Sequence, residues 1–367
     1  MISALLRRVA VLAAVALGAT ASGAGISGAA AQSVPDAPGS IRPVATYSIV
    51  ARDPATGELG VAVQSHWFGV GAIVAFAEAG VGAVATQSFV DPSYGPLGLA
   101  LMRAGRTAPE ALAGLLEADP HPDVRQVGMI DAAGRVAAHT GENAIIAAGH
   151  QTGENYAVQA NLMGSATVWP AMAAAFESTH GDLAERMLAA LEAAQAEGGD
   201  IRGRQSAALL VVSGTPTGRP WVDRVFDLRI EDHPDPLVEL RRLLHLARAY
   251  REMNAGDEAM TVNDVDAAVA RYDAAATLEP GNAEMAYWAG ITLASVGRVE
   301  DALPRLGRAY AADPGWAVLT ARLPAAGLLP EDSALLARLL AIPGGAPGMD
   351  EWRRLAAAGR APQLPAP

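Results

Sequence analysis

Apolar and polar positions begin to alternate at residue 46, and this alternation predicts a β-rich region. Residues 46–52 and 58–65 alternate on either side of a turn at 53–57, whose Asp-Pro pair and Gly are typical of a chain reversal. The pattern predicts an antiparallel hairpin. A register centred on this turn places Thr46 across from about Gln64.

Further apolar runs predict more strands along the next part of the chain. Residues 71–77 and 80–87 form a second predicted hairpin whose residues are nearly all apolar or Gly, as in strands buried on both faces. The remaining predicted strands are 124–131 and 135–140, which form a third hairpin, and 156–163, 207–212 and 222–230.

Four stretches between these strands have helical periodicity, and they lie at 97–103, 108–117, 169–177 and 182–195. Thr107 is the predicted N-cap of the second helix. The order is strands, two helices, strands, two helices, strands. It predicts an α+β fold with helices on both outer faces of two stacked sheets, a four-layer αββα sandwich over residues 44–232.

The chain after the acidic, proline-containing boundary at 231–236 is helical and repetitive. Pro280-Gly281 and Pro314-Gly315 lie 34 residues apart, and a helix-turn-helix period of this length is typical of tetratricopeptide repeats. Helices are predicted at 237–253, 264–278, 283–296 and 299–312, followed by an irregular cap. Residues 237–342 are therefore predicted to form a small all-α domain of tetratricopeptide-like repeats, with a helical array that binds no peptide as the alternative. A flexible tail is predicted for 343–367.

The N-terminal segment has the features of an export signal. Arg7 and Arg8 precede an apolar run at 9–17, and small residues follow up to Ala31. This order predicts a cleavable signal peptide over residues 1–31, with an uncleaved anchor as the alternative. Residues 32–43 then form a leader or linker. The mature protein is expected in the periplasm or outside the cell, with no membrane segment.

Two residue types are absent from the composition. The 27 basic residues are all Arg, and the chain contains no Lys and no Cys. Disulfides, thiolate chemistry and lysine-based catalysis are thereby excluded. The formal net charge of −12 argues against a nucleic acid partner. The seven His show no metal-ligand spacing, and no phosphate-binding loop occurs, so neither a metal nor a cofactor is expected.

Thr46 is the most informative candidate for chemistry. A Thr at the start of the first buried strand is placed as in the N-terminal nucleophile hydrolases, where the hydroxyl attacks a carbonyl and the free α-amine acts as the base. This role requires that Thr46 become the first residue. A second cleavage, between Ala45 and Thr46, is therefore needed after the signal peptide is removed. Otherwise Thr46 is a β-branched strand residue.

Other polar residues are predicted to line the same pocket. The hairpin register places Gln64, Ser65 and His66 beside Thr46, and the fourth strand ends with Thr86, Gln87 and Ser88. The basic run at 202–206 precedes a buried strand and is predicted to form an anion-binding rim or a solvated loop. The further pocket candidates are Asp91, Asn161, Asp200, Arg202, Arg204 and Gln205.

Several sequence blocks resemble one known family over about residues 44–243. The blocks are ATYSIVARDPATGELGVAVQS (45–65), GVGAVATQSFVDPSYGPLGL (80–99), RQVGMIDAAGRVAAHTGE (125–142), YAVQANLM (156–163), GGDIRGRQSAALLVV (198–212) and DLRIEDHPDPLVELRRL (227–243). They resemble the bacterial domain of unknown function 1028, in the Ntn-hydrolase-like superfamily. The resemblance implies the αββα sandwich and matches Thr46 to a Thr near the family's N-terminus. It implies no established reaction, and the lysine found beside the threonine of proteasome-type subunits is absent here.

Three functions remain open at this point. The first is an exported amide or peptide-bond hydrolase with Thr46 as nucleophile and a small amide or peptide as substrate. The second is a non-catalytic binding module whose helical repeats bind a protein partner. The third is an unprocessed enzyme that uses Ser65 or Ser88 with His66. Homo-oligomerisation is compatible with all three.

Overall fold

The computed structural model describes residues 46–342. The predicted signal peptide, leader and tail lie outside these residues. The first part of the described chain contains ten strands and five α-helices. The strands are β1 (Thr46–Arg52), β2 (Leu59–Ser65), β3 (Ala75–Glu78), β4 (Gly82–Ser88), β5 (Arg125–Asp131), β6 (Val136–Thr140), β7 (Gly149–Gly153), β8 (Tyr156–Asn161), β9 (Ser206–Val212) and β10 (Arg224–Ile230). The helices are α1 (Gly71–Val74), α2 (Tyr94–Arg103), α3 (Ala108–Ala118), α4 (Val168–Ser178) and α5 (Leu183–Ala196), with a short 3₁₀ turn at Pro122–Val124.

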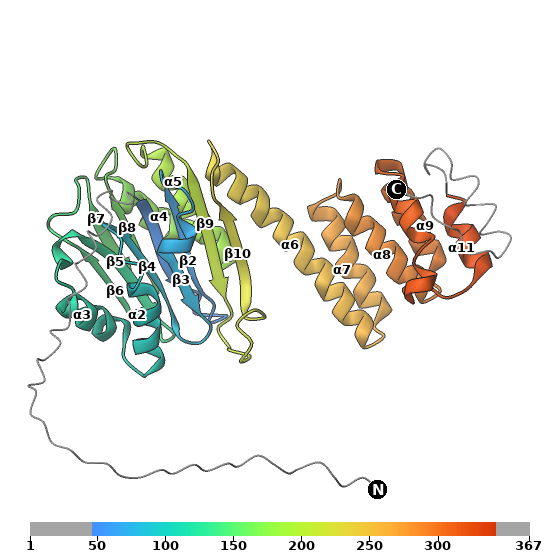
Figure 1. Cartoon of the computed structure of the whole chain (residues 1–367), viewed down its shortest axis with the longest axis horizontal. Coiled ribbons are helices and arrows are strands. Elements are labelled where there is room, and N and C mark those ends of the chain that lie inside the picture. The colour runs from blue at the N-terminus through green and yellow to red at the C-terminus, as the bar shows by residue number, and fades with distance from the viewer. Residues whose placement is uncertain (1–45, 343–367) are drawn as a thin grey trace, which may run out of the picture. The chain divides into compact units, whose positions relative to one another are not determined.

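The strands form two antiparallel sheets (Figure 1). One has six strands in the order β10-β9-β2-β1-β8-β7, and the other has four in the order β3-β4-β5-β6. β1 is thus a central strand, hydrogen-bonded to β2 on one side and to β8 on the other. The predicted first hairpin is confirmed, because β1 and β2 pair from Thr46↔Ser65 to Arg52↔Leu59.

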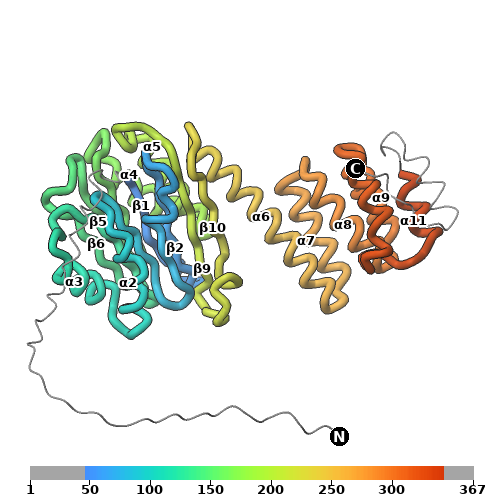
Figure 2. Tube along the Cα trace, viewed as in Figure 1, coloured from blue at the N-terminus to red at the C-terminus, as the bar shows by residue number. Residues whose placement is uncertain are grey.

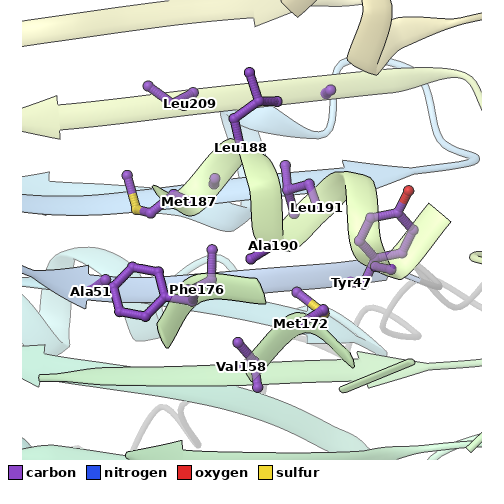
Figure 3. Packing of buried hydrophobic residues seen from close by; sticks show 14 of the residues in the cluster. Tyr47, Ala51, Val158, Met172, Phe176, Met187, Leu188, Ala190, Leu191 and Leu209 are labelled. Atoms are coloured by element: carbon purple, nitrogen blue, oxygen red, sulfur yellow. The ribbon is translucent and has the colours of Figure 1, made fainter. Parts of the chain in front are cut away.

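Alternate residues of β1 are buried on opposite faces of the six-stranded sheet. Tyr47, Ile49 and Ala51 pack with apolar residues of α4 and α5, as Figure 3 shows for this cluster. Val50, by contrast, joins a second cluster that includes Ala83 and Ala85 of β4. Since strand side chains alternate in direction, Thr46 and Ser48 point with Val50 toward the four-stranded sheet.

Helices α2 and α3 cover the other face of the four-stranded sheet. Leu99 of α2 and Leu112 of α3 pack with Val84 and Met129 of that sheet. The Thr107 side chain accepts a hydrogen bond from the backbone N–H of Glu110, and the Glu110 carboxylate accepts one from the backbone N–H of Thr107. The general α+β class is therefore confirmed, with helices and sheets packed into shared cores.

The second part of the described chain is helical (Figure 2). Its helices are α6 (Pro236–Thr261), α7 (Val265–Leu278), α8 (Ala283–Ser295), α9 (Val299–Ala312), α10 (Gly315–Thr320) and α11 (Ser333–Leu340), with a 3₁₀ turn at Pro324–Ala326. Consecutive helices contact one another, α6 with α7 and α8 with α9. The predicted irregular cap after 312 is matched up to residue 342, where α10, the 3₁₀ turn and α11 are all short. None of the helices within 46–342 combines the length and apolar character of a membrane span.

Two elements differ in kind from the sequence-based expectation, and α6 continues to Thr261 where a helix ending at 253 is predicted. Residues 71–77 were expected as one strand, but Gly71–Val74 form a helical turn and the strand begins at Ala75. A short apolar run has no periodicity that separates a buried turn of helix from a strand. The edge strand β7 was not expected, because its sequence, GHQTG, has no apolar residue to mark it.

Candidate functional site

Three strand ends meet around Thr46. Thr46 is the first residue of β1, and its cross-strand partners are Ser65 at the end of β2 and Asn161 at the end of β8. All three side chains are completely buried. The Thr46 hydroxyl donates a hydrogen bond of 3.2 Å to the Ser65 hydroxyl. The structure therefore brings together three of the predicted site residues.

The facing sheet contributes Gln87 of β4 to the same cluster. Gln87 Nε2 donates to the carbonyl oxygen of Thr46 at 3.1 Å and to Gln126 Oε1 at 2.7 Å. Its Oε1 accepts a hydrogen bond of 2.7 Å from the hydroxyl of Ser48. Both glutamines are fully buried, so this polar contact crosses the interior between the two sheets.

Gln126 and Gln159 are central to the cluster, but the sequence analysis did not single them out. Asn161 Nδ2 donates to Gln126 Oε1 at 2.9 Å, and Gln126 Nε2 donates to the carbonyl of Ala160 at 2.9 Å. Gln159 Nε2 lies 3.2 Å from the hydroxyl of Ser48. Gln126 precedes the apolar run Val127–Ile130 of β5, and Gln159 lies between Val158 and Ala160 of β8; a polar residue next to apolar strand residues is the sequence signal that marks a buried amide.

The cluster continues through Gln126 and Thr140 to His150. Gln126 Nε2 also donates to Thr140 Oγ1 at 2.9 Å, and Thr140 Oγ1 lies 2.8 Å from His150 Nδ1. Burial, with a further contribution from His139, lowers the pKa of His150. A neutral imidazole is thereby favoured at this end of the cluster, where it accepts or donates without adding charge.

The register corrects the expected position of Gln64. Thr46 pairs with Ser65 rather than with Gln64, and this difference of one residue places Gln64 on the opposite face of β2. Gln64 instead pairs with Tyr47, whose hydroxyl donates to Gln195 Oε1 at 3.0 Å. Burial and then Asp200 raise the pKa of Tyr47 well above its usual value, so the phenol stays protonated. Neither amide atom of Gln64 has a hydrogen-bond partner among the described residues.

Thr86 and Ser88 do not share the position of Gln87. Side chains alternate along β4, so Thr86 points away from Thr46, and its hydroxyl donates to the carbonyl of Asp91 at 3.1 Å. Asp91 uses its carboxylate to accept from the backbone N–H of Ser93 in the following turn. Ser88 has a positive φ of 72°, and its buried hydroxyl lacks a hydrogen-bond partner within 46–342. A positive φ at a Ser is a strained conformation at the end of a strand that borders the cluster.

A buried carboxylate lies beside the cluster. Asp200 accepts hydrogen bonds from the backbone N–H of His66 at 3.0 Å and from Arg202 Nη2 at 2.8 Å. The backbone of Asp200 also bridges to Met163, just after β8. Asp200 therefore ties the segment after β2 to the segment after β8 and neutralises the charge of Arg202.

Arg204 and Gln205 contact the segment that precedes α6. Arg204 forms an ion pair with Asp235, and Gln205 Nε2 donates to Asp232 Oδ1 at 3.1 Å. Both guanidinium groups of the 202–206 run are thus paired with carboxylates. No group of three His, Asp or Glu side chains within 46–342 is placed to share a metal ion.

The fold and the site together define an α+β protein with a buried amide-and-hydroxyl cluster between two sheets. The family model "Family of unknown function (DUF1028)" matches residues 46–240, which is more than half of the 367 residues. The chain belongs to this family.

One solved structure gives an independent comparison. It is the crystal structure of a DUF1028 protein from Silicibacter pomeroyi, which is 31% identical. The match covers 55% of this chain and 86% of that chain, with a TM-score of 0.50. No curated protein matches the chain.

Proposed function

We propose that residues 44–232 form an αββα sandwich of the Ntn-hydrolase type that hydrolyses an amide or peptide bond, with Thr46 as the nucleophile. The observation that carries the proposal is the position of Thr46. It begins a central strand, and its hydroxyl points into the space between the sheets beside Ser65 and Asn161. A nucleophile needs this kind of fixed position within reach of a bound carbonyl.

The proposed mechanism requires a free α-amine on Thr46. The amine removes the proton of the hydroxyl as the oxygen attacks the substrate carbonyl, and it then returns this proton to the leaving amine. Water hydrolyses the resulting threonine ester and restores the enzyme. An α-amine with a pKa of about 8 is partly unprotonated at neutral pH and is therefore suited to this role. Asn161 Nδ2 donates one N–H to Gln126, and its second N–H is of the type that stabilises an oxyanion.

This mechanism links activity to two processing steps. Residues 1–31 would direct export to the periplasm or the medium and then be removed, and cleavage between Ala45 and Thr46 would create the nucleophile. The first test is therefore the N-terminus of the mature chain, determined by intact mass and N-terminal sequencing. We expect a chain that begins at Thr46.

The second test compares Thr46→Ala with Thr46→Ser on a library of small amides and peptides. The alanine variant should remain folded and lose activity, whereas the serine variant keeps a hydroxyl and should retain part of it. A folded, active protein that begins at Gln32, or an alanine variant with unchanged activity, would refute the proposal.

A binding module without catalysis is the second candidate, and the composition of the cluster favours it. Gln87, Gln126, Gln159 and Asn161 are neutral amides, which bind polar groups well but do not transfer protons at neutral pH. A mature chain that begins at Gln32 and binds an amide ligand unchanged would support this candidate.

For residues 237–342 we propose an interaction arm of tetratricopeptide-like repeats. The support is the helical pairing α6–α7 and α8–α9, with Pro280-Gly281 and Pro314-Gly315 in equivalent breaks 34 residues apart. Such an arm would bind an extended or helical segment of a protein partner. Removal of 237–342 also removes the apolar face of α6 that packs on the sheet core, so the test should use substitutions on α7 and α8 rather than truncation.

A further inference from the structure

A surface cavity of about 360 Å³ lies beside the turn between β1 and β2, at the opposite end of β1 from Thr46. Its lining includes Glu58 just before β2, Phe226 of β10, Arg251 of α6 and Leu278 at the end of α7. The volume lies in the range of sites that bind small molecules. Since β1 extends over roughly 20 Å, this cavity is separate from the cluster around Thr46.

Helix α6 forms one wall of the cavity and is fixed against the sheet core. Leu240 and Leu244 of α6 are fully buried in the core that also contains Phe226. Two turns further along α6, the guanidinium of Arg251 lies over the Phe226 ring, 5.0 Å from its centroid. Stacking of this kind holds the plane of a guanidinium and leaves its N–H groups at the edge, where they can bind oxygen atoms. The fold therefore positions the Arg251 cation before any ligand binds.

Three of the charged residues that line the cavity already have partners of opposite charge. Arg248 donates to the carboxylate of Asp182 at 2.6 Å and to that of Glu185 at 3.0 Å. Glu252 pairs with Arg271 at 3.1 Å. Each of these lining residues therefore has its charge compensated within the protein, and the other two charged residues of the lining determine what the cavity can bind.

Glu58 and Arg251 are these other two charged residues, and neither forms an ion pair with another residue of 46–342. Burial raises the pKa of Glu58, and the nearby Arg251 opposes this rise without cancelling it. Asp53 adds a second carboxylate in the adjacent turn, where it accepts hydrogen bonds from the backbone N–H groups of Ala55 and Thr56. The cavity thus has a negative wall at the turn and a fixed cation on α6.

We infer that this cavity binds an α-amino acid with an apolar side chain, at a site that is independent of the proposed hydrolase site. The ligand carboxylate accepts two hydrogen bonds from the guanidinium of Arg251, which is the geometry that a planar guanidinium favours. The ligand ammonium lies at the turn, where it compensates the carboxylates of Glu58 and Asp53. Leu278, which is 39% exposed, provides apolar surface for the ligand side chain.

Isothermal titration calorimetry of the full chain tests the two charge contacts separately. L-Leucine is compared with N-acetyl-L-leucine, which lacks the ammonium, and with L-leucinamide, which lacks the carboxylate. We expect each derivative to bind at least about tenfold more weakly than leucine, because each leaves one protein charge without its partner. L-Aspartate should also bind more weakly than leucine, since the other cation of the lining is already paired.

Two substitutions assign the contacts to individual residues. Glu58→Gln should weaken leucine binding about tenfold and abolish the preference for leucine over N-acetyl-leucine. Arg251→Gln should weaken leucine binding by a similar factor and abolish the preference for leucine over leucinamide. Arg308→Gln is the matched control, because Arg308 on α9 is exposed and also lacks an ion pair within the described residues. This control should bind leucine as the parent protein does.

The Thr46→Ala variant determines which end of the sheet holds the ligand. Unchanged leucine binding in this variant supports the cavity beside the β1–β2 turn, whereas loss of binding would overturn the inference and assign the ligand to the cluster around Thr46. Absence of leucine binding by the parent protein, or equal affinity for leucine and its two derivatives, would also overturn it. If leucine does not bind and Glu58→Gln, Arg251→Gln and the double variant lower Tm equally, the two residues pair with each other instead.

Discussion

Two buried glutamines of this protein provide a direct comparison of satisfied and unsatisfied amides. Gln87 and Gln64 are both fully buried in strands. Gln87 has three hydrogen-bond partners, Thr46, Ser48 and Gln126. Gln64 has none among the described residues for either amide atom. Replacement of either Gln by Leu removes the amide and roughly preserves the side-chain volume. The two variants should therefore differ mainly in how many neighbouring polar groups lose a hydrogen-bond partner.

The expected magnitudes follow from the groups that lose a partner. Gln87→Leu removes the acceptor of the Ser48 hydroxyl and a donor to the Thr46 carbonyl, while Gln126 Oε1 still accepts from Asn161. Each buried group left unpaired costs about 1–3 kcal/mol, so we expect a loss of roughly 2–5 kcal/mol in the free energy of unfolding. Gln64→Leu removes a buried amide without partners and should be neutral or stabilising by about 1–2 kcal/mol.

The assay is differential scanning calorimetry and urea unfolding of the full chain with each single substitution and with both. A shift of roughly 2–4 °C in Tm per kcal/mol makes the difference between the two variants measurable. Gln64 is on the face of the six-stranded sheet that packs on α4 and α5, whereas the Gln87 side chain, from β4, contacts the opposite face of that sheet. The effects of the two substitutions on stability should therefore add. An equal loss for both variants, or a larger loss for Gln64→Leu, would show that hydrogen bonding in the cluster does not determine the stability of these strands.

Two further predictions concern helices away from the site. Thr107→Ala removes one half of the reciprocal cap with Glu110 and should lower the free energy of unfolding by about 1 kcal/mol, measured by urea unfolding, with Thr107→Ser retaining most of it. The pKa of Glu185 is lowered in the folded chain, because hydrogen bonds from Arg241 and Arg248 outweigh the opposing effect of burial. The ion pairs of Glu185 therefore contribute stability above its ordinary pKa that is lost as the pH falls through the lowered value, and Glu185→Gln should flatten this acid limb of the stability profile.

The first hairpin shows how far the sequence alone defines the structure. Asp53 accepts a hydrogen bond from the backbone N–H of Ala55 within the turn, and Gly57 adopts a positive φ of 76°. These local contacts are encoded by adjacent residues, so the strand bounds of β1 were predictable. The cross-strand partner of Thr46 was not predictable to one residue, and a register error of one residue moves every side chain of the strand to the opposite face of the sheet.

The rest of the site depends on contacts that no local pattern encodes. Gln126 and Gln159 lie in separate strands, 33 positions apart in sequence from one another (159 − 126), and they meet the β1 residues only after the two sheets pack. Their sequence signal is a polar residue beside apolar strand residues, which is equally typical of an edge or of a solvent-facing position. The two amides are recognised as members of one cluster only when the sheets pack against each other and bury both side chains between them.

The absence of lysine from the chain limits which group can act as the base for Thr46. Ser65, Gln87 and Gln126 accept hydrogen bonds from Thr46, Ser48 and Asn161, and hydroxyl and amide groups of this kind do not act as bases at neutral pH. Arg stays charged and cannot replace lysine as a base. Under the proposed mechanism the α-amine of Thr46 is the base, so catalysis requires cleavage between Ala45 and Thr46. A single measurement, activity before and after removal of the preceding residues, would therefore separate an enzyme from a binding module on the same fold.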